Sequence, residues 1–242
     1  MQHAPRLADR LALITGATRG IGRAVALAYA REGAHLILVG RTAGALEEVD
    51  DEVRECGRPA TLLTLNLNDL DRIDALGPTI FQRWGKLDIL VGNAGVLGPL
   101  SPLGHVTAEA WKDVIDLNLN TNWRLIRTLD PLLRRSEAGR AIFVTSGAAA
   151  NRRAYWGPYS VSKAGLEALV HTYAAEMVNT NVRANLINPG PVRTAMRAKA
   201  FPGEDPATLR WPEDITERFV ELAEAASNYN GRIFDLKTNE MR

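Results

Sequence analysis

The sequence has little cysteine, little net charge and no long apolar run, and each shortage excludes a class of protein. Cys56 is the single cysteine among 242 residues, so an internal disulfide and a cysteine-based zinc site are excluded, and a reducing, cytoplasmic location is expected. The 29 basic and 28 acidic residues leave a net charge of +1, which disfavours nucleic acid and anionic membranes as partners. No apolar run approaches the ~18 residues of a membrane-spanning helix, so a soluble protein is expected.

Short apolar runs alternate with longer amphipathic segments, which is typical of a parallel sheet covered by helices on both faces. We predict an α/β fold with a doubly wound parallel seven-stranded sheet of the Rossmann type, three layers, and a single domain over residues 1–242. Acidic residues fill the helical segment around Leu46, Val49 and Val53, and we interpret them as a solvated helix face, with no metal site. The candidate strands are 11–15, 35–39, 60–65, 87–92, 141–146, 182–188 and 232–236.

The stretch LITGATRGIGRAVALAYA, residues 13–30, joins an apolar strand to a helix through a turn rich in glycine. Gly16, Gly20 and Gly22 permit close approach of the backbone to a ligand, and the unpaired N–H groups at a helix start favour an anion such as phosphate. The spacing G-x-x-x-G-x-G differs from the G-x-G-x-x-G of the standard dinucleotide fingerprint. This turn alone therefore leaves both a phosphate site and a simple turn open.

A second pattern places Ser146 at the end of a strand, Tyr159 thirteen residues later and Lys163 four residues after that. If residues 157–178 form a helix, Tyr159 and Lys163 lie on one face of it. An ammonium ~4 Å from a phenol, at an effective dielectric of ~20, is worth roughly 4 kcal/mol, which lowers the phenol pKa from ~10 toward neutrality. Each residue alone has an ordinary structural explanation, but together they predict general acid–base chemistry.

These and further motifs, in their order along nearly the whole chain, resemble the short-chain dehydrogenases/reductases. The matching motifs are TGATRGIG (15–22), NAG (93–95), Asn118 in DLNLN, Ser146, YSVSK (159–163) and PGPVRT (189–194). The resemblance implies a sheet in the order 3-2-1-4-5-6-7. It also implies that the protein transfers a hydride between a nicotinamide ring and a small-molecule carbonyl or alcohol.

The resemblance further implies roles for single residues. Tyr159 is the acid/base, and Lys163 lowers its pKa and holds the nicotinamide ribose. Ser146 steadies the substrate oxygen, and Asn118 positions the water of a proton relay. The implied cofactor contacts are Gly16, Thr18, Arg19, Gly20, Ile21, Gly22, Arg41, Asn66, Leu67, Asn93, Ala94, Gly95, Tyr159, Lys163, Pro189, Gly190, Val192 and Thr194. Gly92 departs from the family, many members of which carry a second asparagine before NAG.

Charge at the end of the second strand predicts which nicotinamide cofactor binds. Gly40 stands where an NAD site has an aspartate or glutamate that binds the adenosine ribose, and Arg41 follows it. Arg41 and Arg19, without a nearby carboxylate, are suited to a 2′-phosphate, so the predicted cofactor is NADP(H). The alternative, that either arginine is plain surface charge, stays open.

Loops that follow the strands predict the substrate pocket, since ligands of doubly wound folds lie there. The loops 95–103, 147–158 and 193–212 contribute apolar side chains and four arginines, which suggests an apolar pocket with a basic rim. The alternative for Arg152 and Arg153 is that both simply face solvent and form no part of a pocket rim.

Association and turnover complete the predictions. Apolar residues surround the helix that contains Tyr159, and family members often pair it and the helix before strand 5, here 107–135, across dimer contacts. We therefore expect a homodimer or homotetramer. An NADP(H)-dependent oxidoreductase is the favoured function, and a cofactor-binding regulator of the same fold without turnover is the alternative. A methyltransferase is disfavoured by the glycine pattern.

Overall fold

A sheet of eight strands forms the middle layer of the computed structural model, which describes residues 4–242. The strand order is β3-β2-β1-β4-β5-β6-β7-β8, parallel throughout except for the antiparallel pair β7 and β8. The predicted sheet type and order are confirmed, and β8 is an addition that the sequence analysis missed. Residues 1–3 of the expected domain lie outside the described part. The strands are β1 (Leu11–Thr15), β2 (His35–Gly40), β3 (Thr61–Thr64), β4 (Ile89–Gly92), β5 (Arg140–Val144), β6 (Arg183–Asn188), β7 (Ile233–Asp235) and β8 (Glu240–Met241).

The central strands are buried along their whole length, because helices cover both faces of the sheet. Their near-continuous apolar sequences reflect this burial. In the register of the sheet, Ile14 of β1 lies beside Leu38 of β2 and Val91 of β4. The parallel register brings the carboxyl ends of these strands to one edge of the sheet, and the candidate site residues follow those ends.

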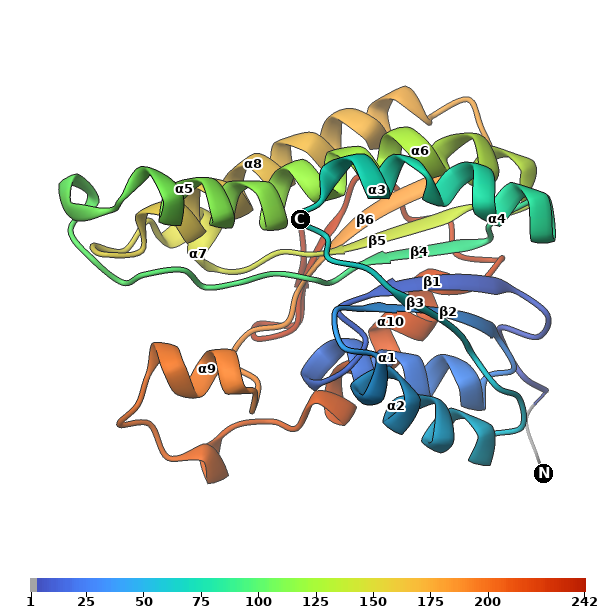
Figure 1. Cartoon of the computed structure of the whole chain (residues 1–242), viewed down its shortest axis with the longest axis horizontal. Helices are drawn as coiled ribbons and strands as arrows, with labels where there is room; N and C mark the ends of the chain where they lie inside the picture. Colours follow the sequence, from blue (N-terminus) through green and yellow to red (C-terminus); the bar gives the residue numbers. More distant parts are fainter. Residues whose placement is uncertain (1–3) are drawn as a thin grey trace.

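Helices form the two outer layers (Figure 1). One face of the sheet carries α1 (Gly20–Arg31), α2 (Ala43–Glu55) and α10 (Thr216–Ala223). The other face carries α3 (Leu70–Asp74), α4 (Leu76–Trp84), α5 (Ala108–Ile115), α6 (Thr121–Arg135) and α8 (Gly157–Glu176). The short helices α7 (Ala148–Asn151) and α9 (Ala195–Ala200) follow β5 and β6. In the part of the chain that the structure describes, no helix has the length and apolarity needed to cross a bilayer.

The acidic face predicted for α2 is wrong at one residue. Asp50 is only 3% exposed, because its carboxylate accepts a hydrogen bond from the Ala60 amide and pairs with Arg54. Alternation of charged and apolar residues does not reveal such a partner, which comes from the chain entering β3. Across residues 4–242, no three His, Cys, Asp or Glu side chains converge as metal ligands.

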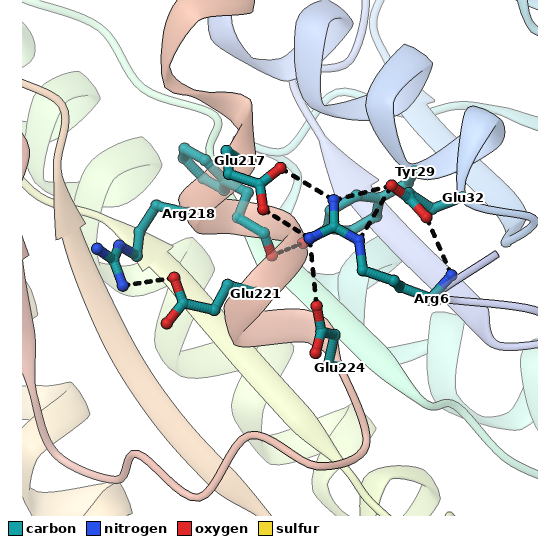
Figure 2. Close-up of polar contacts among 8 residues, drawn as sticks. Arg6, Tyr29, Glu32, Glu217, Arg218, Glu221 and Glu224 are labelled. Atoms are coloured by element: carbon teal, nitrogen blue, oxygen red, sulfur yellow. Dashed lines mark hydrogen bonds and ion pairs between the residues drawn. The ribbon is translucent and has the colours of Figure 1, made fainter. Parts of the chain in front are cut away.

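Arg6 fastens the N-terminal segment to two helices of one layer (Figure 2). Its guanidinium pairs with Glu32 just after α1, at 2.8 Å, and with Glu217 and Glu224 at α10, at 2.6 and 3.4 Å. These hydrogen bonds hold the pKa of both Glu32 and Glu217 below the ordinary value. Beside this network the Tyr29 hydroxyl donates to the Phe219 carbonyl, so α1 and α10 are joined at the end of α1 remote from the glycine turn.

Candidate active site

The glycine turn leaves the start of α1 open to a ligand. Gly16 and Gly20 have φ of +63° and +55°, a region that glycine adopts readily. A Cβ on Gly22 would lie 2.2 Å from the Gly16 carbonyl oxygen, so only glycine allows the helix to start this close to the turn. Arg19, the N-cap residue, makes no side-chain capping hydrogen bond. The first N–H groups of α1 therefore keep their capacity to bind an anion.

Asn93 and Thr15 hold this turn against the end of β4. The side-chain amide of Asn93 donates to the backbone carbonyl oxygens of Thr15 and Gly16, at 2.9 and 3.2 Å. In return the Thr15 hydroxyl accepts from the amides of Asn93 and Ala94. Gly92, the departure noted above, has a spatial reason, because a Cβ there would lie 2.4 Å from the Phe143 ring.

A side chain at Gly40, the end of β2, would require its neighbours to shift. A Cβ on Gly40 would lie 2.7 Å from the Thr18 methyl carbon. Arg19 and Arg41 are both exposed, and neither forms an ion pair with a carboxylate of residues 4–242. Two unpaired guanidiniums therefore lie at the ends of β1 and β2.

The predicted contacts after β3 are of two kinds. Asn66 is exposed and its carbonyl oxygen accepts from the Asn68 amide, so its side chain caps its own turn. Leu67 is buried, and its backbone carbonyl accepts from the Thr121 hydroxyl at 2.7 Å. Leu67 thereby connects this loop to the start of α6.

Tyr159 and Lys163 lie one turn apart in α8, and both are buried, at 8% and 4% exposure. The predicted helix is confirmed, with Pro158 in its first turn, where a missing N–H costs nothing. The Lys163 ammonium donates to the Val144 carbonyl at 2.8 Å and lies 5.9 Å from the centre of the Tyr159 ring. Side chains at this spacing share a face, and here that face is turned toward the end of β5.

The expected lowering of the Tyr159 pKa by Lys163 is wrong for this structure. Burial raises the pKa of Tyr159, and a hydrogen bond with Ser146 only partly offsets that effect. Burial also lowers the pKa of Lys163 from 10.5 to about 8. The ammonium donates to the Val144 carbonyl, and the causes that set the pKa of Tyr159 here are burial and the hydrogen bond with Ser146.

Lys163→Met is expected to stabilise the protein at pH 7. The lowered pKa, about 8 against 10.5, means that burying the ammonium costs roughly 3 kcal/mol below pH 8. Loss of the hydrogen bond to Val144 removes about 1 kcal/mol of stability, so the net gain is about 2 kcal/mol. Between pH 8 and 10.5 the unfolded chain binds the extra proton, so wild-type stability rises with pH and the gain disappears.

Urea unfolding at pH 7 and pH 10 measures this difference. Lys199→Met removes an exposed lysine and serves as the matched control, with no pH-dependent effect expected. Equal stabilities of wild type and Lys163→Met at pH 7 would contradict the burial penalty.

Asn118 connects the loop after β4 to α8. It lies in a π-helical turn at Asp116–Asn120 that separates α5 from α6, a local feature often found at functional sites. Its fully buried side chain bonds both backbone groups of Val96 and donates to the Ser162 hydroxyl at 3.0 Å. Ser162 in turn donates to the Tyr159 carbonyl at 2.8 Å. Ser162 was not predicted as a site residue, although it lies within the motif YSVSK (159–163).

The segment containing α9 packs against the residues around Tyr159. Met196 and Ala200 contact an apolar cluster of Leu97, Ala148 and Tyr159. The Trp156 ring contacts both Tyr159 and Phe201, the residue that follows α9. Its centre lies 6.0 Å from that of the Tyr159 ring and 5.6 Å from that of the Phe201 ring.

The predicted basic rim is only partly present. The Arg197 guanidinium lies over the Phe201 ring and is neutralised by Glu204, whereas Arg153 lies over both Phe201 and Trp156. Arg152 and Arg153 are both exposed. Four large apolar side chains of the loops expected to form the pocket are exposed instead, namely Leu100, Leu103, Tyr155 and Trp211.

The loop after β6, Pro189 to Thr194, runs back toward the glycine turn. A Cβ on Gly20 would lie 3.4 Å from the Thr194 methyl carbon. Thr194 also caps α9, while Val192 is buried. The loop is held by Arg210, which donates to the Pro189 carbonyl, and by Asn188, which accepts from the Gly190 amide. Asn188 is a second residue that the sequence analysis did not identify.

The chain is similar to known proteins in sequence and in fold. A family model described as short chain dehydrogenase matches residues 10–205. The uncharacterized oxidoreductase YciK of Escherichia coli (strain K12) is 38% identical over 233 residues, which cover 95% of this chain and 92% of the relative. A sepiapterin reductase of Chlorobaculum tepidum is 36% identical over 216 residues, which cover 86% of this chain and 88% of the relative. A solved chain from Escherichia coli CFT073, described as a short chain dehydrogenase complexed with NADPH, is 37% identical with a TM-score of 0.92, covering 97% of this chain and 99% of its own.

Proposed function

The chain belongs to the short-chain dehydrogenase family, and on that premise we propose that it transfers a hydride between NADP(H) and a carbonyl or secondary alcohol. The observation that carries this proposal is the buried pair Tyr159 and Lys163, at the same edge of the sheet as the open start of α1. The bound nicotinamide supplies or accepts the hydride.

The residues present fit NADP(H). The start of α1 lacks a side-chain cap, so its N–H groups would hold the cofactor diphosphate. Arg19 and Arg41 would hold the 2′-phosphate, and Gly40 leaves no acidic group to repel it. The other cofactor contacts are proposed on the resemblance to the family, and the solved relative from E. coli CFT073 is complexed with NADPH.

Proton transfer is the part of the reaction assigned to the chain itself. Tyr159 gives its proton to the substrate oxygen during reduction, and burial keeps the phenol protonated at neutral pH. Ser146 donates a hydrogen bond to the same oxygen. Lys163 would exchange its bond to Val144 for one to the nicotinamide ribose, which brings its charge to the phenol. Asn118 would position the relay water at the turn it occupies.

Two observations favour a second candidate, a cofactor-binding regulator without turnover. Lys163 is engaged with a backbone carbonyl, and the α9 segment packs against the residues around Tyr159. An assay of NADPH consumption with ketones, aldehydes, quinones and acyl-thioesters separates the two candidates. Turnover of any member supports the enzyme, whereas tight NADPH binding without consumption across the panel supports the regulator.

The substrate proposed is a small carbonyl compound with an apolar body. Leu97, Ala148, Trp156 and Met196 surround the Tyr159 side chain with apolar surface. Arg197 is neutralised by Glu204, whereas Arg153, over Phe201 and Trp156, and Arg193, over Trp211, have no carboxylate partner among residues 4–242. We therefore expect the protein to reduce ketones that have an apolar body, whether or not they also carry an anionic group.

Self-association through α5, α6 and α8 is the proposed assembly, as a homodimer or homotetramer. Trp111, Trp123 and Val161 are 36%, 45% and 47% exposed on these helices. Trp123→Glu is expected to give a monomer at micromolar protein in light scattering, because a buried charge at such a contact is costly. Phe81→Glu, which alters an equally exposed residue of α4, is the control and should keep the assembly. A monomeric wild type would contradict the proposal.

We further propose that residues 1–242 work as one domain, because the described part shares one sheet between two cores. The single Cys56 keeps the cytoplasm as the expected location.

A further inference from the structure

Asn188, the last residue of β6, joins two loops that border the candidate active site. Its side-chain oxygen accepts from the Gly147 amide at 3.1 Å and from the Gly190 amide at 3.2 Å. The side chain is 5% exposed, so these bonds are shielded from water. Two backbone donors on one acceptor identify that atom as the oxygen, since an amide nitrogen accepts neither.

The two loops have different tasks in the proposed reaction. Gly147 directly follows Ser146, whose hydroxyl contacts Tyr159 and would bind the substrate oxygen. Gly190 belongs to the loop that would enclose the nicotinamide. One side chain therefore fixes the spacing between the segment that holds the hydride acceptor and the segment that holds the hydride donor.

Asp235, at the end of β7, orients the Asn188 amide. The Asn188 side-chain nitrogen donates to one Asp235 oxygen at 2.8 Å. The other Asp235 oxygen accepts from the backbone amides of Lys237 and Thr238, at 2.9 and 3.4 Å, in the turn that leads to β8. The hairpin of β7 and β8 thus anchors Asp235, and Asp235 fixes which end of the Asn188 amide faces the two loops.

We propose that Asn188, oriented by Asp235, is a positioning residue that sets the distance between substrate and nicotinamide. The proposal rests on the proposed function. It assigns a role in catalysis to the C-terminal hairpin, which lies outside the segment matched by the family model. Reaction rates depend steeply on such a distance, because a displacement of about 1 Å costs about 100-fold.

An exchange of the two side chains tests this arrangement. Asn188→Asp places two carboxylates in contact, and Asp235→Asn leaves an amide that satisfies either Asn188 or the turn, but not both. In the double variant Asn188→Asp/Asp235→Asn, the bond between the two side chains is restored with donor and acceptor reversed, and the backbone amides of both loops and of the turn again find an oxygen. We expect each single change to lower kcat about 10- to 100-fold and the double variant to regain the wild-type kcat within about threefold.

Asn185→Asp is the matched control for a purely structural effect. Asn185 lies in the same strand, is 1% exposed and bonds the Tyr229 carbonyl and the Arg232 amide, away from both loops. It should lower the melting temperature without lowering kcat. Hydrogen exchange in the cofactor-free protein gives a readout besides activity: the Gly147 and Gly190 amides should exchange faster in Asn188→Asp and recover protection in the double variant.

The outcomes separate this proposal from the proposed function. If wild type turns over and Asn188→Asp keeps the wild-type kcat, or if the double variant stays as slow as the single ones, Asn188 does not position the loops. If wild type itself consumes no NADPH with any panel substrate, the proposed function fails, and the exchange data alone still decide whether Asn188 holds the two loops.

Discussion

Replacing Tyr159 by phenylalanine is expected to lower kcat/KM for carbonyl reduction by about 10²- to 10⁴-fold, the usual contribution of a positioned proton donor. The substitution removes one hydroxyl from a side chain that is 8% exposed and leaves the ring contacts with Trp156 in place. The protein should therefore fold normally and bind NADPH within about threefold of the wild-type affinity. Initial rates with the fastest panel substrate, together with a fluorescence titration of NADPH, measure both quantities.

Tyr155→Phe is the matched control for this experiment. Tyr155 lies four residues earlier and is 60% exposed, so loss of its hydroxyl should leave kcat/KM unchanged. If Tyr159→Phe retained the rate of the control variant, the proton would come from another group and the assignment of Tyr159 would be wrong.

Arg41→Asp should reverse the cofactor preference. Charge-assisted hydrogen bonds to a phosphate contribute about 1.5–3 kcal/mol, so their loss weakens NADPH binding about 10- to 100-fold, and the new carboxylate adds repulsion. The same carboxylate can accept hydrogen bonds from the ribose hydroxyls of NADH, so NADH binding should hold or improve. The ratio of the two dissociation constants is expected to change by about 10²- to 10³-fold.

The control for cofactor preference is Arg31→Asp. Arg31 is exposed at the other end of α1, so this variant makes the same change in net charge far from the expected phosphate. Titrations at low and high salt measure the contribution of charge, because screening weakens the phosphate contact. Equal affinities of wild type for NADPH and NADH would show that neither Arg41 nor Arg19 meets a 2′-phosphate.

The sheet could be predicted from the sequence because most of its strands are short apolar runs between helical segments. Burial on both faces makes this pattern strong in β1, β2, β4 and β5. β8 was missed because two exposed residues, Glu240 and Met241, contain no periodicity. Asp50 was misassigned for a different reason, since its partner at Ala60 lies in another segment.

The candidate site was predictable where chemistry and spacing coincide. The spacing of four positions between Tyr159 and Lys163 brings the two side chains onto one helix face, as expected. The hydrogen-bond partner of the Lys163 ammonium was not predictable. The ammonium donates to the Val144 carbonyl, and no pattern in the sequence identifies that acceptor. Asn188 and Ser162 were not predicted as site residues for the same reason, because the partners of each are brought together only by folding.

The most direct test of the central claim follows one atom. NADPH that carries deuterium at the transferable C4 position is incubated with the protein and the best panel substrate, and the product is analysed by mass spectrometry. The account predicts an alcohol with one deuterium on its carbinol carbon from wild type, formed far more slowly by Tyr159→Phe. NADPH bound at micromolar concentration, with no deuterated product from any substrate of the panel, would contradict it.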